Sequence, residues 1–227
     1  MKDVSIIVPS YERPQRTRRA IQAILDQKFT GTWQALVVGD KCPAIDEMLQ
    51  SGEASTFMEQ AKHQGNSMAI FNLPIHYGGW GYQCRITGVR LSYTNYTVFM
   101  DNDDVILPNH LQSYYDAISG TENDFMALCT KLEPIENAGA PNGRIRVPEM
   151  ENGKVGYQEL IVKSSFLKRM PPQEPIYNAD WHLVQNMINA AAKFEIVTDN
   201  TPTHIIMGVG ELREKIAQRY TQEGFPT

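Results

Sequence analysis

Four polar residues, Asp101 to Asp104, stand directly after the apolar run 98–100, and apolar residues resume at once behind them. Carboxylates about 4 Å apart repel by ~4 kcal/mol near a protein surface, so this cluster predicts a cation nearby. Residues i and i+2 of an extended chain share a face, so Asp101 and Asp103 can offer two carboxylates to one divalent ion. Oxygen ligands suit Mg²⁺ or Mn²⁺, whose open positions a phosphate-bearing substrate can fill. Alternatively, one of these acids caps the helix that Pro108 opens.

The elements that must position this cluster are apolar runs that alternate with amphipathic stretches. The runs predict strands at 4–8, 35–38, 68–73, 97–100, 125–129 and 194–197, and the stretches predict helices between them and a last helix at 211–220. Such alternation predicts an α/β protein with a doubly wound, mostly parallel sheet. Ligands of open α/β sheets bind at the carboxyl ends of the strands, which is where the acidic cluster falls.

The amino-acid composition changes in the second half of the chain. Residues 134–148 are rich in Pro, Gly and Asn, and β-type patches follow at 144–147 and 159–162. We expect an irregular or antiparallel elaboration there.

Other groups suited to chemistry lie outside the acidic cluster. The loop Gly78-Gly79-Trp80-Gly81 lets the backbone approach a phosphate, but a tight turn needs the same glycines. Arg85, one turn into the next helix, is either a surface charge or a diphosphate partner. Asp180 begins an apolar helix, so it is either an N-cap or a carboxylate held at a cleft. His204 falls in the predicted loop 198–210, and lone histidines are usually structural.

Charge and cysteine content exclude several classes of protein. The chain has 21 Lys and Arg against 26 Asp and Glu, a net charge of −5, and no basic tract. General binding to nucleic acid or anionic membranes is therefore not expected. Three widely spaced cysteines indicate reduced core residues in a cytoplasmic protein. The N-terminus has neither a signal peptide nor a membrane span, and no later segment reaches 18 apolar residues.

Taken together, these motifs resemble the family 2 glycosyltransferases of the GT-A fold over roughly residues 3–190. VSIIVPSYERP is similar to the family's first strand and turn, LVVGDKCP to its second strand, and GGWGYQCRITGV to its Gly-rich loop and helix. VFMDNDD resembles the F-L-D-x-D-D metal motif, and NADWHL resembles the acceptor-side E-D-W-x-L motif. The chain departs from the family pattern at Gly39-Asp40-Lys41-Cys42, which has one acid where the common D-D-G-S has two, and at Ala179, where relatives have Glu.

The resemblance implies a role for each matching residue. Donor-binding residues would be Pro9, Tyr11, Glu12, Asp40, Gly79, Arg85, Asp101 and Asn102. Asp101 and Asp103 would hold Mn²⁺ or Mg²⁺, and His204 would be a third ligand or would contact the diphosphate, as a C-terminal histidine does in some GT-A enzymes. Asp180 would be the base that deprotonates the acceptor hydroxyl, with inversion at the anomeric carbon.

The function expected from this resemblance is transfer of a sugar from a nucleotide-diphosphate donor, most often a UDP-sugar. The acceptor would be a glycan, a lipid-linked sugar or a small molecule, and the sequence is compatible with a homo-oligomer. We expect one GT-A domain over residues 1–227, with a nucleotide-sugar half at 1–130 and an acceptor-side half with a C-terminal helix at 131–227. Two alternatives stay open: a nucleotidyltransferase, and a module that binds a nucleotide sugar with little or no turnover.

Overall fold

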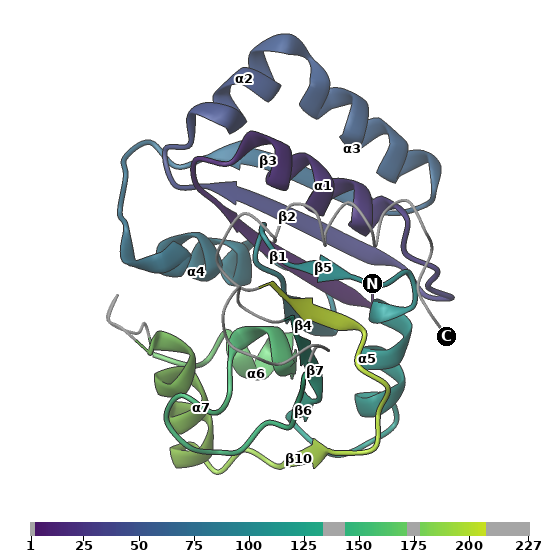
Figure 1. Ribbon diagram of the computed structural model, residues 1–227, viewed down its shortest axis with the longest axis vertical. Coiled ribbons are helices and arrows are strands. Elements are labelled where there is room, and N and C mark those ends of the chain that lie inside the picture. The colour runs from purple at the N-terminus through teal and green to yellow at the C-terminus, as the bar shows by residue number, and fades with distance from the viewer. Residues whose placement is uncertain (1–2, 134–143, 172–177, 208–227) are drawn as a thin grey trace.

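A computed structural model describes residues 3–133, 144–171 and 178–207 (Figure 1). The strands are β1 (Val4–Ser10), β2 (Trp33–Gly39), β3 (Ser67–Asn72), β4 (Tyr96–Phe99), β5 (Val105–Ile106), β6 (Phe125–Leu128), β7 (Thr130–Leu132), β8 (Arg144–Arg146), β9 (Leu160–Lys163), β10 (Phe194–Val197) and β11 (His204–Ile206). The α-helices are α1 (Pro14–Leu25), α2 (Pro43–Ser51), α3 (Glu53–His63), α4 (Tyr82–Leu91), α5 (His110–Ile118), α6 (Ser164–Leu167) and α7 (Ala179–Asn189). Short 3₁₀ turns, η1 (Gly79–Gly81) and η2 (Tyr157–Glu159), precede α4 and β9. The helix predicted at 211–220 lies outside the described residues.

The main sheet has seven strands in the order β10-β6-β9-β4-β1-β2-β3. Pairing is parallel everywhere except around β9, which runs antiparallel to both β4 and β6. The mostly parallel, doubly wound sheet predicted from the alternating pattern is therefore confirmed. The strand predicted at 159–162 joins this sheet as β9 instead of forming a separate elaboration.

Helices cover both faces of the sheet because successive residues of a buried strand point to opposite sides. In β1, Ile6 packs in the cluster with α1, α2, α3 and α5, whereas Ile7 packs in the cluster with α6 and α7. Both side chains are fully buried. Burial of such a side chain contributes about 1.5–3 kcal/mol, so this layered core holds the strand ends in fixed positions.

A second, four-stranded sheet has the order β5-β11-β7-β8 and lies beside the carboxyl end of β4. The sequence predicted a loop at 198–210, but residues 204–206 form β11, which pairs antiparallel with β5 and parallel with β7. The strands β5, β7 and β11 have only two or three residues each, which is too short for a periodic pattern. Among the described residues, no helix has both the length and the apolar character needed to traverse a bilayer.

Candidate active site

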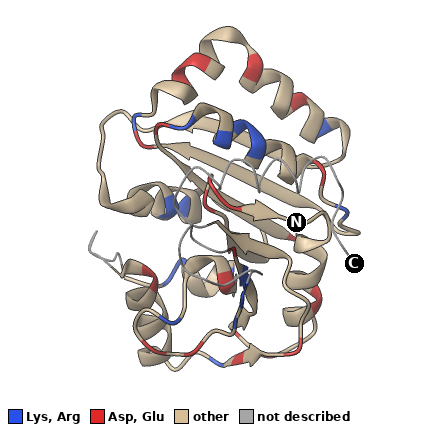
Figure 2. Ribbon diagram, in the orientation of Figure 1, with Lys and Arg blue, Asp and Glu red and all other residues tan. Residues whose placement is uncertain are grey.

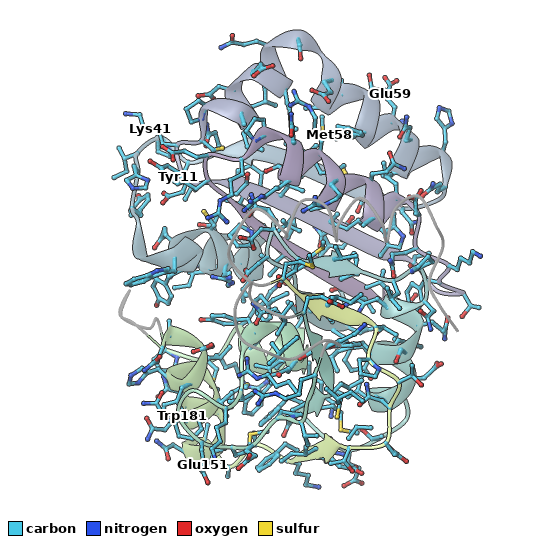
Figure 3. The ribbon with its side chains drawn as sticks, in the orientation of Figure 1. Tyr11, Lys41, Met58, Glu59, Glu151 and Trp181 are labelled. Carbon is cyan, nitrogen blue, oxygen red and sulfur yellow. The ribbon has the colours of Figure 1, made fainter. Side chains whose placement is uncertain are left out.

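The ends of β1, β2 and β4 meet at one edge of the main sheet because these neighbouring strands are parallel. Tyr11 and Lys41, which follow β1 and β2, accordingly lie close together in Figure 3. A cleft of about 520 Å³, the large cleft, opens at this edge, a size typical of small-molecule sites. Its walls are Pro9, Ser10, Tyr11, Glu12, Arg13, Asp40, His76, Gly78, Trp80, Gly81, Arg85, Asp101, Asn102 and Asp103.

A second hollow, the small cleft, adjoins the large one and measures about 250 Å³. Its walls are Gly79, Trp80, Tyr82, Arg85, Asp101, Tyr157, Gln158, Asn178, Ala179 and Asp180. Trp80, Arg85 and Asp101 belong to both clefts. The tertiary structure thus brings the acidic cluster, the Gly-rich loop and the start of α7 to one site.

Asp101 is held by a cation and an amide at the boundary between the clefts. Its carboxylate accepts a hydrogen bond from the Arg85 guanidinium and one of 2.7 Å from Gln158 Nε2. Arg85 is buried, and its guanidinium lies 4.5 Å from the ring centroid of Tyr157. Burial alone would lower the pKa of Arg85, but the interactions with Asp101, Tyr157 and Asp180 together outweigh burial and raise that pKa. Arg85 is therefore a permanent positive charge inside the site, and its interpretation as a surface charge is wrong.

Asp103 faces two arginines from the neighbouring strand-to-helix turn. Arg13 donates directly to Oδ2 of Asp103, and Arg16 Nη1 lies 3.8 Å from the same oxygen. These belong to the arginine-rich start of α1, which is blue in Figure 2. The predicted cation near the acidic cluster is, in this structure, a guanidinium group. Asn102 also lines the large cleft, and its side-chain amide donates to Thr17 Oγ1 at 3.0 Å.

Asp40 anchors the loop that bounds the large cleft. Its two carboxylate oxygens accept hydrogen bonds of 2.8 Å each from the backbone N–H groups of Tyr77 and Gly78. His76 Nδ1 lies 3.1 Å from Asp40 Oδ2, and the His76 ring stacks on Tyr11 with centroids 4.5 Å apart. Tyr11 is 42% exposed, so an aromatic face is presented at the end of β1.

Asp180 lies one residue into α7 and on the wall of the small cleft. The residue at the cap position is Asn178 with φ 67°, so the alternative that made Asp180 the N-cap is wrong. Asp180 Oδ1 accepts a 2.8 Å hydrogen bond from the backbone N–H of Trp181, and the residue lines the small cleft.

Backbone strain is concentrated around the two clefts. Among the described residues, six non-glycine residues have a positive φ: Glu12, Arg13, Lys41, Trp80, Asn178 and Ala191. Four of them, Glu12, Arg13, Trp80 and Asn178, line one or both clefts. Such conformations cost about 1–3 kcal/mol each and gather at functional sites. The pattern independently marks this edge of the sheet as the working part of the molecule.

Comparison with known families agrees with this geometry. Residues 5–170 match the model of glycosyl transferase family 2. The chain belongs to this family. As a family 2 glycosyltransferase, it has the GT-A fold that its mixed sheet and helical layers predict.

Known proteins are similar to this family 2 chain in sequence or in structure. The poly(ribitol-phosphate) beta-N-acetylglucosaminyltransferase TarP of Staphylococcus aureus is 26% identical over 168 residues, which cover 73% of this chain and 46% of TarP. The chain thus spans about half the length of that curated relative. The structure of S. aureus TarS 1-349 in complex with UDP-GlcNAc has a TM-score of 0.68 at 18% identity, covering 93% of this chain and 60% of the other.

A mannosyltransferase from Pyrobaculum calidifontis, PcManGT, solved with GDP-Man and Mn²⁺, shares the fold with a TM-score of 0.65 at 13% identity. The match covers 96% of this chain and 62% of PcManGT.

His204 takes a different position from the one the resemblance implied. Its ring is fully buried in β11, it is not on the wall of either cleft, and its Nε2 lies 3.1 Å from Asp104 Oδ2. Asp104 Oδ1 also accepts a 3.0 Å hydrogen bond from the backbone N–H of Met207. Asp104 therefore has a structural role and orients its neighbours, whereas Asp101 and Asp103 line the large cleft.

Several cleft residues were not identified from the sequence, among them Tyr157, Gln158 and Trp80. Gln158 and Tyr157 come from η2, and both approach Asp101 or Arg85 across more than 50 positions of the chain. Trp80 stands in the Gly-rich loop of the sequence, but its position at the boundary of two clefts was not predicted. Its unusual neighbours, three glycines, were the one signal available.

Proposed function

We propose that this family 2 chain transfers a sugar from a nucleotide-diphosphate donor, most simply a UDP-sugar, to an acceptor hydroxyl. One observation carries the proposal: Asp101 and Asp180 lie on adjoining clefts that share Trp80, Arg85 and Asp101 as walls. A donor in the large cleft and an acceptor in the small cleft would meet at that boundary. The UDP-GlcNAc complex of TarS and the activity named for TarP support a UDP-sugar as the donor.

The nucleotide would bind along the ends of β1 and β2. Tyr11 offers its exposed ring to a planar base, with Pro9 and Glu12 beside it on the cleft wall. Asp40 lies on the same wall, but both its oxygens hold the 77–78 backbone, so its part in binding is mainly to fix that loop. Gly78 and Gly79 then allow close approach of the diphosphate.

Two carboxylates at a strand end fit a divalent ion by the chemistry of the donor set. Asp101 and Asp103 provide hard oxygen donors, and their side chains are 28% and 16% exposed. Among the described residues, no group of three or more His, Cys, Asp or Glu could enclose a metal ion. Mg²⁺ and Mn²⁺ commonly take their remaining ligands from substrate phosphates and water, so two protein carboxylates suffice. Such an ion would neutralise the charge that develops on the leaving diphosphate.

Arg85 and Asp180 would complete the chemistry. The buried guanidinium of Arg85 lies at the boundary of the clefts, where it stabilises negative charge on the leaving group. Asp180 would accept the proton of the acceptor hydroxyl as that oxygen attacks the anomeric carbon. A base and a leaving group on opposite sides of the transferred ring would invert the anomeric configuration.

The test is nucleotide release combined with calorimetry. The chain is first screened with UDP-, GDP-, TDP- and CMP-sugars and Mn²⁺ for slow hydrolysis, which a module without turnover would not catalyse. UDP binding with and without Mn²⁺ is then compared in wild type, Asp103→Ala and Asp116→Ala. Asp116 is an exposed acid on α5, so its loss gives the same charge change away from the clefts. Asp103→Ala should abolish the Mn²⁺-dependent part of UDP binding. If it binds both normally, the proposal fails.

A further inference from the structure

Trp80 is an unusually exposed aromatic residue at the boundary between the large and small clefts. Its relative exposure is 72%, the highest among the large apolar side chains of the described residues. An indole combines a large apolar face with one polar N–H group, which suits a binding surface that is partly apolar and partly in contact with water. Trp80 lines both clefts, whereas Tyr11 and His76 line only the large one.

The backbone holds Trp80 in this position at a cost. Trp80 has φ 51° and ψ 38°, the left-handed region that a bulky residue rarely adopts, within a run of glycines at 78, 79 and 81 that also have positive φ. Its carbonyl oxygen accepts a 2.7 Å hydrogen bond from Arg85 Nη1, and Arg85 also binds Asp101. Arg85 therefore links the backbone of Trp80 to Asp101, the carboxylate proposed to lie beside the diphosphate.

The boundary position selects one part of the substrates as the partner of Trp80. In the proposed reaction the bond to the diphosphate breaks beside Asp101, while the acceptor oxygen attacks from the side of Asp180. The transferred ring is the substrate group that must lie between these two carboxylates. A side chain shared by both clefts is placed to contact that ring, and not the nucleotide.

We propose that the indole of Trp80 is the platform on which the transferred sugar ring of the donor stacks. This inference rests on the proposed function. The negative π-face of an indole attracts the electropositive C–H groups on one face of a pyranose ring. The ligand class is therefore a nucleotide sugar whose sugar is a cyclic pyranose with an unsubstituted C–H face. Trp80 would contribute to the affinity for the sugar and not to the affinity for the nucleotide diphosphate.

Calorimetry on the full chain with Mn²⁺ tests this division. UDP is compared with the tightest binder among UDP-GlcNAc, UDP-glucose and UDP-galactose, in wild type, Trp80→Ala, Trp80→Phe and Trp181→Phe. Trp80→Ala should lose about three- to tenfold in affinity for the nucleotide sugar and keep its affinity for UDP. Trp80→Phe should recover part of the loss. Trp181, on α7 (Figure 3), is the control and should retain the full difference between the two ligands.

Fluorescence quenching by iodide gives a readout that does not depend on affinity. Of the three tryptophans, Trp33 is 1% exposed, Trp181 is partly exposed and Trp80 is 72% exposed, so Trp181→Phe leaves Trp80 as the main source of accessible emission. The nucleotide sugar should protect wild type and Trp181→Phe from iodide more than UDP does, and this extra protection should be absent in Trp80→Phe.

Two failures are distinguishable. Equal weakening of UDP and the nucleotide sugar by Trp80→Ala, or extra protection that persists in Trp80→Phe, would overturn the platform and leave the proposed function standing. Wild type that binds neither UDP nor any of the nucleotide sugars would overturn the proposed function as well.

Discussion

Nε2 of His204 lies 3.1 Å from Oδ2 of Asp104, and both side chains are buried beneath the carboxyl end of β4. This pair joins β11 to the turn that carries Asp101 and Asp103, although the two residues are 100 positions apart. This buried contact holds the acidic turn in place, while the carboxylates of Asp101 and Asp103 line the large cleft.

The pair predicts that His204 contributes to stability and not to metal binding. His204→Ala should lower the free energy of unfolding by about 3 kcal/mol, because a cavity forms and Asp104 loses a buried partner. Urea unfolding measures the loss. Folded His204→Ala should bind Mn²⁺ with wild-type affinity. A protein of unchanged stability with weakened Mn²⁺ binding would instead restore His204 as a metal ligand.

His110 predicts a loss of stability in acid. Its ring is buried, its Nδ1 lies 3.1 Å from Thr203 Oγ1, and burial, followed by the nearby His204, holds its pKa well below the ordinary value. Below about pH 6.5 the unfolded chain therefore binds a proton that the folded chain does not. The free energy of unfolding should fall on acidification by up to about 1.4 kcal/mol per pH unit from this group.

The contribution of His110 can be isolated with His110→Gln, which does not titrate. Urea unfolding of both proteins from pH 7.5 to 5.5 should give a shallower pH dependence for the variant. Parallel curves for the two proteins would mean that His110 is not buried in its neutral form.

The ion pair between Arg13 and Asp103 predicts that Arg13 competes with a divalent ion for this carboxylate. Its guanidinium occupies Asp103 Oδ2, yet the Arg13 side chain is 49% exposed, so the ion pair is screened and weak. Arg13→Ala should bind Mn²⁺ about two- to fivefold more tightly in the absence of nucleotide, because one of the two guanidinium groups that face this carboxylate is removed. Free Mn²⁺ can be followed by electron paramagnetic resonance. Arg18→Ala is the control, since Arg18 pairs with Glu53. Weaker Mn²⁺ binding by Arg13→Ala would contradict the competition.

Gly81 predicts that the Gly-rich loop tolerates no side chain at its contact with β1. Gly81 has φ +78°, and an added Cβ would lie 2.6 Å from Pro9 Cβ. Gly81→Ala should therefore weaken UDP binding and cost more stability than the ~1–2 kcal/mol of the left-handed backbone alone. Gly120→Ala separates the two terms, because Gly120 has φ +79° with nothing within 4 Å. Equal losses in both variants would show that the contact with Pro9 relaxes freely.

Replacement of Asp180 is predicted to slow catalysis without weakening donor binding. Asp180→Asn keeps the size of the side chain but cannot accept the acceptor proton, so transfer should slow by about 10²- to 10⁴-fold. Calorimetry should show unchanged affinity for UDP. Asp116→Asn is the matched control on α5. Transfer at the normal rate by Asp180→Asn would remove the base assignment.

Much of the fold could be predicted from the sequence because each buried strand corresponds to a continuous apolar run. Every strand predicted in the first hundred residues is present, at nearly the predicted bounds. The second sheet could not be predicted, because β5, β7 and β11 are short and their pairing is decided by tertiary contacts. Position 204 shows the consequence, since a residue predicted to lie in a loop is part of a buried strand.

The sequence by itself determined that an acidic cluster, a Gly-rich loop and Asp180 follow or precede elements of a parallel sheet, and parallel strands bring their ends to one edge. Only the tertiary structure decided how those groups divide their work. Hydrogen bonds reach Asp101 from Gln158 and Asp104 from His204, over 57 and 100 positions, and no local pattern encodes such partners. The same long-range packing turned Trp80 from a loop residue into the shared wall of two clefts.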